Sequence, residues 1–189
     1  GSEMCIRDSA NGDEANDEIA SLLEGSDRNN KDGRHGGDIQ GIINNLDYIE
    51  DMGFTQLWLN PVLENNQADY SYHGYSTTDY YKIDSRFGSN KLYQDLSRKA
   101  KDRNIGLIKD LVLNHIGSGH WWMNDLPTYD WLNYQDNYKQ TNHIHETVYD
   151  PHLPVSQKDL FTEGWFVETM PDLNQKNPFV ATYLEQVAI

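Results

Sequence analysis

The order of helical and strand patterns constrains the fold of this chain more than any other feature. Residues 39–52 place apolar side chains on one face of a helix, and Asp38 before them is a typical helix cap. Residues 55–61, TQLWLNP, predict a short buried strand. A second helix is expected after Ser89, and it leads into a second buried strand at 105–113. Two strands joined through a helix predict a parallel sheet with helices on its faces, which is an α/β fold.

Polar residues stand at the carboxyl ends of both predicted strands. Asn60 ends the first strand, and Asn114 and His115 end the second. In parallel α/β sheets, ligands bind beyond the carboxyl ends of the strands. Position alone leaves two interpretations of His115: a capping histidine whose hydrogen bonds are satisfied within the protein, or a histidine that contacts a ligand.

The composition argues against several classes of partner. The 189 residues include 15 Lys and Arg against 30 Asp and Glu, so the formal net charge is −15. This charge argues against nucleic acid and an anionic membrane surface, and it suits a neutral substrate or a bound cation. Aromatic residues make up 12% of the chain, which suits either sugar-binding faces or core packing. One cysteine excludes an internal disulfide framework, and no stretch is apolar and long enough to span a membrane.

The second half of the chain departs from the regular pattern. Residues 116–170 carry scattered His, Pro and Trp without a clear period, which predicts an irregular excursion. Four tryptophans lie in this segment, and at least two of Trp121, Trp122 and Trp131 are expected to pack in a core. A helical pattern returns within residues 171–189, where Asn177 is the expected cap and Pro178 the first helical residue.

Several motifs resemble the α-amylase family of glycoside hydrolases. DLVLNH (110–115) is similar to the motif at the end of the third barrel strand of that family, and YHGYSTTDYYKIDSRFGS (72–89) resembles the segment after its second strand. MPDLN (170–174) resembles the motif near the end of the family's inserted domain B. Residues 34–62 and NGDEAND (11–17) are most similar to neopullulanase and cyclomaltodextrinase enzymes, and the whole resemblance covers residues 10 to 189.

The resemblance implies an incomplete TIM (β/α)8 barrel with an irregular domain B inserted after strand 3. Residues 10–115 would form the first βα units of the catalytic barrel, and residues 116–170 the domain B-like insertion. Residues 171–189 would return to the barrel and end before strand 4. The resemblance also suggests a periplasmic or secreted protein, and it leaves the oligomeric state open.

The function that the resemblance implies is that of a retaining α-glucan hydrolase, which cleaves α-1,4 or α-1,6 glucosidic bonds. Such enzymes use two carboxylates about 5 Å apart, a nucleophile and an acid/base. In the family these residues lie at strands four and five, which this chain is not expected to contain. We therefore assign no catalytic residue, and we expect Asp110 to organise the site rather than to act as nucleophile. The alternative is a non-catalytic, calcium-dependent carbohydrate-binding domain.

Three residues are implied to bind a neutral α-glucan substrate. Tyr75 would stack on the sugar ring at the cleavage subsite, since an aromatic face against C–H bonds provides dispersion and excludes water. His73 and His115 would donate hydrogen bonds to hydroxyl groups of the same sugar. Core packing of Tyr75 and capping by His115 are the alternatives.

A calcium (Ca²⁺) site is also implied, because Asn and Asp oxygens are the hard ligands that this ion prefers. Matching the neopullulanase-like pattern selects six ligands: Asn11, Asp13, Asn16, Asp17, the carbonyl of Gly36 and Asp38. One alternative is an acidic solvated loop. Another is an EF-hand-like loop that begins at Asp27, although Lys31 stands at a ligand position and Gly33 is one place late.

Overall fold

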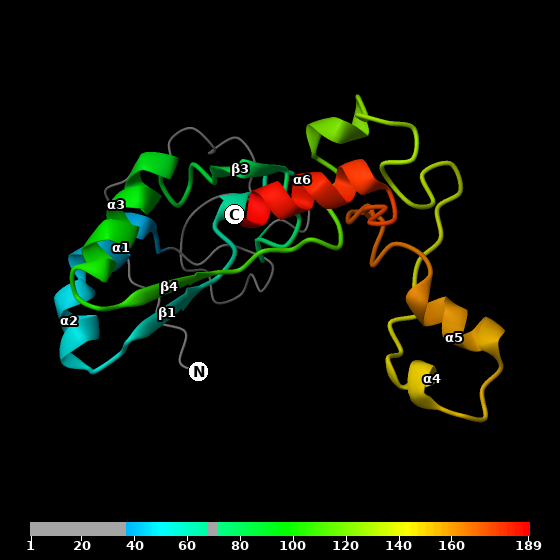
Figure 1. Ribbon diagram of the computed structural model, residues 1–189, viewed down its shortest axis with the longest axis horizontal. Coiled ribbons are helices and arrows are strands. Elements are labelled where there is room, and N and C mark those ends of the chain that lie inside the picture. The colour runs from blue at the N-terminus through cyan, green and yellow to red at the C-terminus, as the bar shows by residue number, and fades with distance from the viewer. Residues whose placement is uncertain (1–36, 68–71) are drawn as a thin grey trace, which may run out of the picture. The chain divides into compact units, whose positions relative to one another are not determined.

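A computed structural model describes residues 37–67 and 72–189 of the chain. These residues form two compact units (Figure 1). Unit 1 contains the described residues up to Tyr75 together with Asp79–Leu111, and unit 2 contains Ser76–Thr78 together with Val112–Ile189. In the part of the chain that the structure describes, none of the helices has both the length and the apolar character to cross a bilayer.

The first predicted helix is divided in two. Helix α1 spans Ile39–Asn44 and helix α2 spans Leu46–Asp51. The predicted cap is confirmed, because Asp38 Oδ1 accepts a hydrogen bond from the Gly41 amide at 2.6 Å. The continuous helix expected over 39–52 is wrong. Asn45 separates the two helices, and its side chain donates to the Gly41 carbonyl at 2.8 Å, a local bond that competes with regular helix geometry.

Two parallel strands form one of the sheets of unit 1. Strand β1 spans Gln56–Leu59 and strand β4 spans Gly106–Lys109, and their register runs from Gln56 opposite Gly106 to Leu59 opposite Lys109. The predicted parallel pairing is therefore confirmed. The second strand was expected to continue to residue 113, and this is wrong. Its partner β1 is followed closely by Pro61, which has no amide hydrogen for the ladder, so pairing stops on both strands.

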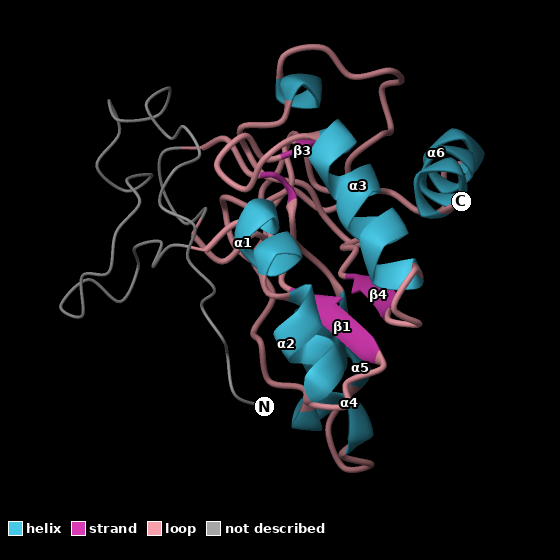
Figure 2. Ribbon diagram, turned by 90° about the vertical axis from the view of Figure 1, so that its left-hand side faces the viewer, coloured by secondary structure: helices cyan, strands magenta, loops and turns pink. Residues whose placement is uncertain are grey.

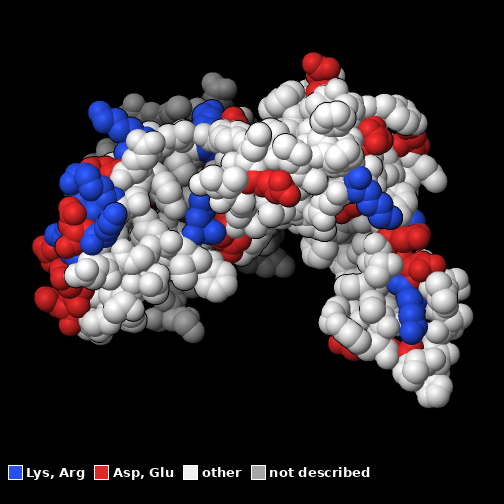
Figure 3. Space-filling model, in the orientation of Figure 1, with Lys and Arg blue, Asp and Glu red and all other residues white. Residues whose placement is uncertain are grey.

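Helix α3, Asn90–Lys101, packs beside α1, as both ribbon views show (Figures 1 and 2). The predicted cap is again confirmed, since Ser89 Oγ accepts from the Leu92 amide at 3.2 Å. Leu96 and Ala100 are fully buried on its inner face. Charged side chains of both signs gather over α2 and α3 (Figure 3), where ion pairs such as Arg98 with Asp95 form.

The expectation that the two parallel strands are buried is wrong, because their residues are half-buried or exposed. Trp58 is 72% exposed and its register partner Ile108 is 42% exposed. Partners in a parallel pair point to the same face, so these apolar side chains form one accessible surface. Sequence pattern alone cannot distinguish a strand covered on both faces from a strand covered on one.

Two short strands lie in the described part of the segment between β1 and α3. Strand β2, Leu63–Glu64, and strand β3, Asp79–Ile83, pair antiparallel with an irregularity in the register. This pairing holds the two ends of the segment together within unit 1.

Unit 2 contains short helices joined by irregular segments. These helices are the 3-10 helix η3 at Trp121–Met123, α4 at Glu146–Tyr149, α5 at Val155–Thr162 and α6 at Pro178–Ala188. Asn177 caps α6, as predicted, through its Oδ1 and the Phe179 amide at 2.8 Å. The buried rings of Trp122 and Trp131 meet edge to face with centroids 5.0 Å apart, which confirms core packing for two of the three tryptophans.

Candidate functional site

The residues 73–75 form a tight loop in unit 1 that presents two of the predicted ligand-binding side chains. The Tyr75 amide donates to His73 Nδ1 at 2.9 Å, and the two rings lie with centroids 5.8 Å apart. Gly74 between them has φ +81°, and a Cβ there would lie 2.8 Å from the Pro61 Cβ. The loop therefore requires glycine at its centre, and it holds His73 and Tyr75 side by side.

The phenol of Tyr75 points to a carboxylate that follows the parallel sheet. Its hydroxyl lies 3.5 Å from Asp110 Oδ2, and Asp110 is the first residue after β4. Partial burial and the charge of Asp110 raise the pKa of Tyr75 above its ordinary value. The phenol consequently stays protonated at neutral pH, and 40% of the residue remains accessible to a ligand.

His115 lies in unit 2, where its backbone forms an isolated antiparallel bridge with Asp172. Its ring is half-buried and nearly parallel to that of Phe166, at 13° with the centroids 6.3 Å apart. Asn114 Nδ2 lies 3.3 Å from His115 Nδ1. Phe166 is a residue that sequence reasoning missed, because it lies in the irregular segment where no period singles it out.

Asp172 of the MPDLN motif connects three segments of unit 2. Its carboxylate accepts from Asn133 Nδ2 at 2.8 Å and from Asn114 Nδ2 at 3.3 Å, and its carbonyl accepts from the Asn133 amide. Burial raises the pKa of Asp172, and this effect is larger than the opposite effect of the hydrogen bonds from Asn133 and Asn114. A carboxyl whose pKa is raised on folding stabilises the folded unit at low pH, and this contribution is lost as pH rises through the raised value.

Of the predicted calcium ligands, the structure describes Asp38 alone. The other five, Asn11, Asp13, Asn16, Asp17 and Gly36, lie outside the described residues, as do Asp27 and Lys31 of the alternative EF-hand-like loop. Asp38 is buried, and one carboxylate oxygen caps α1. Within residues 37–67 and 72–189, no group of three or more His, Cys, Asp or Glu side chains is placed to hold a metal ion.

Comparison with known proteins gives consistent matches. The family described as alpha amylase, catalytic domain, matches residues 11–189. Beta/alpha-amylase of Paenibacillus polymyxa is 38% identical over 182 residues, which cover 93% of this chain and 14% of that protein. Cyclomaltodextrinase of Thermoanaerobacter pseudethanolicus is 34% identical and covers 94% of this chain and 29% of that protein. The crystal structure of an alpha-amylase from Geobacillus thermoleovorans, complexed with acarbose, superposes with a TM-score of 0.67 and 32% identity, covering 90% of this chain and 35% of that chain.

These matches confirm the resemblance stated from the motifs and the TIM-barrel fold that it implies. The parallel strands β1 and β4 are two hydrogen-bonded neighbours of such a sheet. The chain spans less than a third of the length of both relatives. Both are named as amylolytic enzymes, so they give no support to the alternative of a non-catalytic binding domain.

Proposed function

Because this chain belongs to the α-amylase catalytic-domain family, we propose that it forms part of a retaining α-glucan hydrolase and supplies one wall of its sugar site. The observation that carries the proposal is the loop of His73, Gly74 and Tyr75, whose phenol reaches Asp110 at the carboxyl end of β4. That is the end of a parallel strand at which barrel enzymes bind their substrates.

In this proposal Tyr75 provides the stacking surface and His73 a hydrogen-bond donor, and the family resemblance adds His115 as a further donor to the sugar. The loop supports the first part, since it keeps the Tyr75 ring accessible and holds the His73 ring beside it. Stacking on a sugar face needs an accessible ring with a fixed orientation, which the contact with Asp110 provides. The substrate is an uncharged α-linked glucan, in keeping with the net charge of −15.

We further propose that residues 116–170 correspond to domain B of the family and residues 171–189 to the return to the barrel. Irregular segments and short helices occupy most of residues 116–170, in keeping with an inserted subdomain. A periplasmic or secreted location remains part of the proposal on the strength of the family resemblance.

The 189-residue chain is expected to bind malto-oligosaccharides without hydrolysing them. The family resemblance assigns neither the nucleophile nor the acid/base to a residue of this chain, and without that pair neither protonation nor attack occurs. The assay uses purified protein with starch, pullulan and cyclodextrin, and product is measured as reducing sugar. Turnover that disappears when a residue within these 189 is replaced would contradict the assignment.

We also propose that calcium binds at Asn11, Asp13, Asn16, Asp17, the Gly36 carbonyl and Asp38. The oxygen-rich donor set suits this ion, and the rigid cap that Asp38 makes on α1 would fix one ligand. Calcium, when bound, would neutralise carboxylate charge and hold the loop to the first helix.

Calcium is accordingly expected to raise the melting temperature of the chain, because a ligand that binds the folded state stabilises it. The increase should be lost when Asp13→Asn and Asp38→Asn are combined. Asn at position 38 retains an oxygen for the α1 cap, so the variant tests the ion rather than the cap. The measurement is thermal unfolding with calcium and with a chelator. An equal calcium effect in the double variant would reject these ligands.

A further inference from the structure

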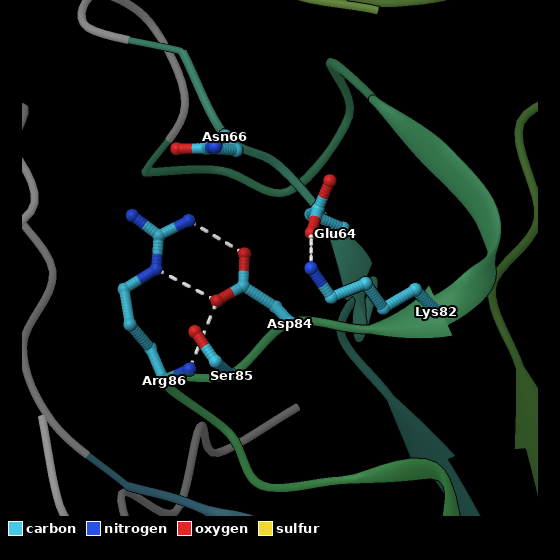
Figure 4. A pocket seen from close by; sticks show the side chains of 6 residues that line it. All are labelled: Glu64, Asn66, Lys82, Asp84, Ser85 and Arg86. Atoms are coloured by element: carbon cyan, nitrogen blue, oxygen red, sulfur yellow. Dashed lines mark hydrogen bonds and ion pairs between the residues drawn. The ribbon is translucent and has the colours of Figure 1, made fainter. Parts of the chain in front are cut away.

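A buried ion pair is connected through Asn65 to the loop of His73 and Tyr75. Arg86 and Asp84 follow strand β3, and both side chains are only 2% exposed. The guanidinium forms a two-point contact with the carboxylate, Nε to Oδ1 at 2.7 Å and Nη2 to Oδ2 at 2.5 Å (Figure 4). Such a contact fixes both position and orientation of the two groups.

This pair holds the backbone of Asn65 from two sides. Arg86 Nη2 donates to the Asn65 carbonyl at 2.8 Å, and the Asn65 amide donates to Asp84 Oδ2 at 3.0 Å. Asn65 is fully buried. Because its amide and its carbonyl are both engaged, its side chain leaves the backbone in a defined direction.

That side chain reaches the ligand-binding loop. Asn65 Nδ2 donates to the Gly74 carbonyl at 2.8 Å, and Gly74 is the residue between His73 and Tyr75. The loop is therefore held on one side by Pro61, against which Gly74 packs, and on the other by Asn65. A continuous set of contacts thus runs from Arg86 and Asp84 through Asn65 to the loop.

The pocket beside the ion pair does not itself suit the substrate. It encloses about 140 Å³ and is lined by polar side chains, including Glu64, Lys82 and Asn66 (Figure 4). Ligand pockets usually measure about 300–1,000 Å³, so this one has room for a few water molecules. Its two cations face two carboxylates, which gives no preference for an ion.

We propose that Asn65 is a positioning residue for sugar binding, which holds the loop of His73 and Tyr75 in place on the rigid base of Asp84 and Arg86. The proposal extends the function proposed above, on which the sugar-binding role of the loop rests. Asn65 touches no substrate, and it acts by setting where the Tyr75 ring stands relative to Asp110.

The test replaces Asn65 and follows the phenol of Tyr75 by NMR with tyrosine labelled at Cζ. The variants are Asn65→Ala and Asn65→Ser, neither of which reaches the Gly74 carbonyl. The control is Asn90→Ala, because Asn90 also holds backbone in unit 1, at Ile83 and Tyr81, away from the loop. Tyr75→Phe assigns the signal, and Tyr93, whose pKa is raised by burial alone, is an internal reference.

Both Asn65 variants should bring the pKa of Tyr75 back toward its ordinary value, because the phenol moves away from Asp110. Asn90→Ala should leave that pKa raised, and the pKa of Tyr93 should be the same in all proteins. Maltotriose affinity, measured by calorimetry, should fall by about fivefold in the Asn65 variants, as expected for one lost hydrogen bond. If Asn65 had a merely structural role, its replacement would lower the melting temperature and leave both the pKa of Tyr75 and the maltotriose affinity unchanged.

The outcomes separate the two proposals. A lowered Tyr75 pKa in the Asn65 variants without any glucan binding by the unmodified chain would support the positioning role and refute the sugar site. Folded Asn65 variants with unchanged Tyr75 pKa and affinity would overturn the positioning role. If both Asn65 variants fail to fold while Asn90→Ala folds, Asn65 is a folding determinant and the positioning role is also overturned.

Discussion

Replacing His115 with alanine in an active enzyme that contains this chain is expected to lower kcat by about 10²-fold or more. The physical reason is that a hydrogen bond to a sugar hydroxyl tightens as positive charge develops on the ring in the transition state. A contact made mainly in the transition state lowers kcat more than it raises KM. The half-buried ring of His115, beside Phe166, is accessible enough to make such a contact.

A second histidine provides the matched control for this prediction. His120 is only 1% exposed, and its Nδ1 accepts from the Trp122 amide at 3.1 Å, which caps the 3-10 helix η3. His120→Ala should therefore lower the melting temperature, whereas His115→Ala should change it little. The readings are steady-state kinetics and thermal unfolding of both variants. If His115→Ala lowered the melting temperature and left kcat nearly intact, His115 would be a structural cap and would not belong to the sugar site.

Arg86→Met is expected to destabilise the chain by about 3–5 kcal/mol, the largest loss of stability that we predict. The substitution keeps an apolar stem but leaves the Asp84 carboxylate buried without its cation. It also removes the hydrogen bonds that the carboxylate accepts from Nε and Nη2, and it leaves those from the backbone amides of Arg86 and Asn65. An uncompensated buried charge costs far more than the loss of an exposed ion pair.

Two further variants separate this explanation from a general loss of charge. Arg98→Met removes an exposed arginine that pairs with Asp95 on α3, and it should change the midpoint of urea unfolding little. Asp84→Leu combined with Arg86→Met removes both buried charges, and it should be more stable than Arg86→Met alone. Equal losses in Arg86→Met and Arg98→Met would show that burial of the pair does not determine its contribution.

Local features of the fold were predictable from the sequence. The caps Asp38, Ser89 and Asn177 each bond an amide two or three residues ahead, so their effect is contained in a short stretch of chain. The parallel pairing followed from the order of the elements. The end of β4 at Lys109 could not be predicted from its own residues, because it depends on where the partner strand meets Pro61.

The candidate site was also predictable only where its residues lie close together in the sequence. His73 and Tyr75 lie close in sequence and share a motif, so their proximity is a local property. The partner of Tyr75 is Asp110, 35 residues away, and only the register of the sheet brings the two together. Asn65 was missed for the same reason, since its contacts with Asp84 and Gly74 span 19 and 9 residues without any periodic signal.

The central claim, that the chain provides one wall of an α-glucan site, is tested most directly by NMR titration of the labelled protein with maltotriose. The account predicts saturable shifts at His73 and Tyr75, and at His115 in the other unit. The β-linked isomer cellotriose should give weaker shifts, and Tyr75→Ala should abolish those at His73. Maltotriose shifts that are absent, that fall on residues elsewhere, or that cellotriose reproduces at equal concentration would contradict the account.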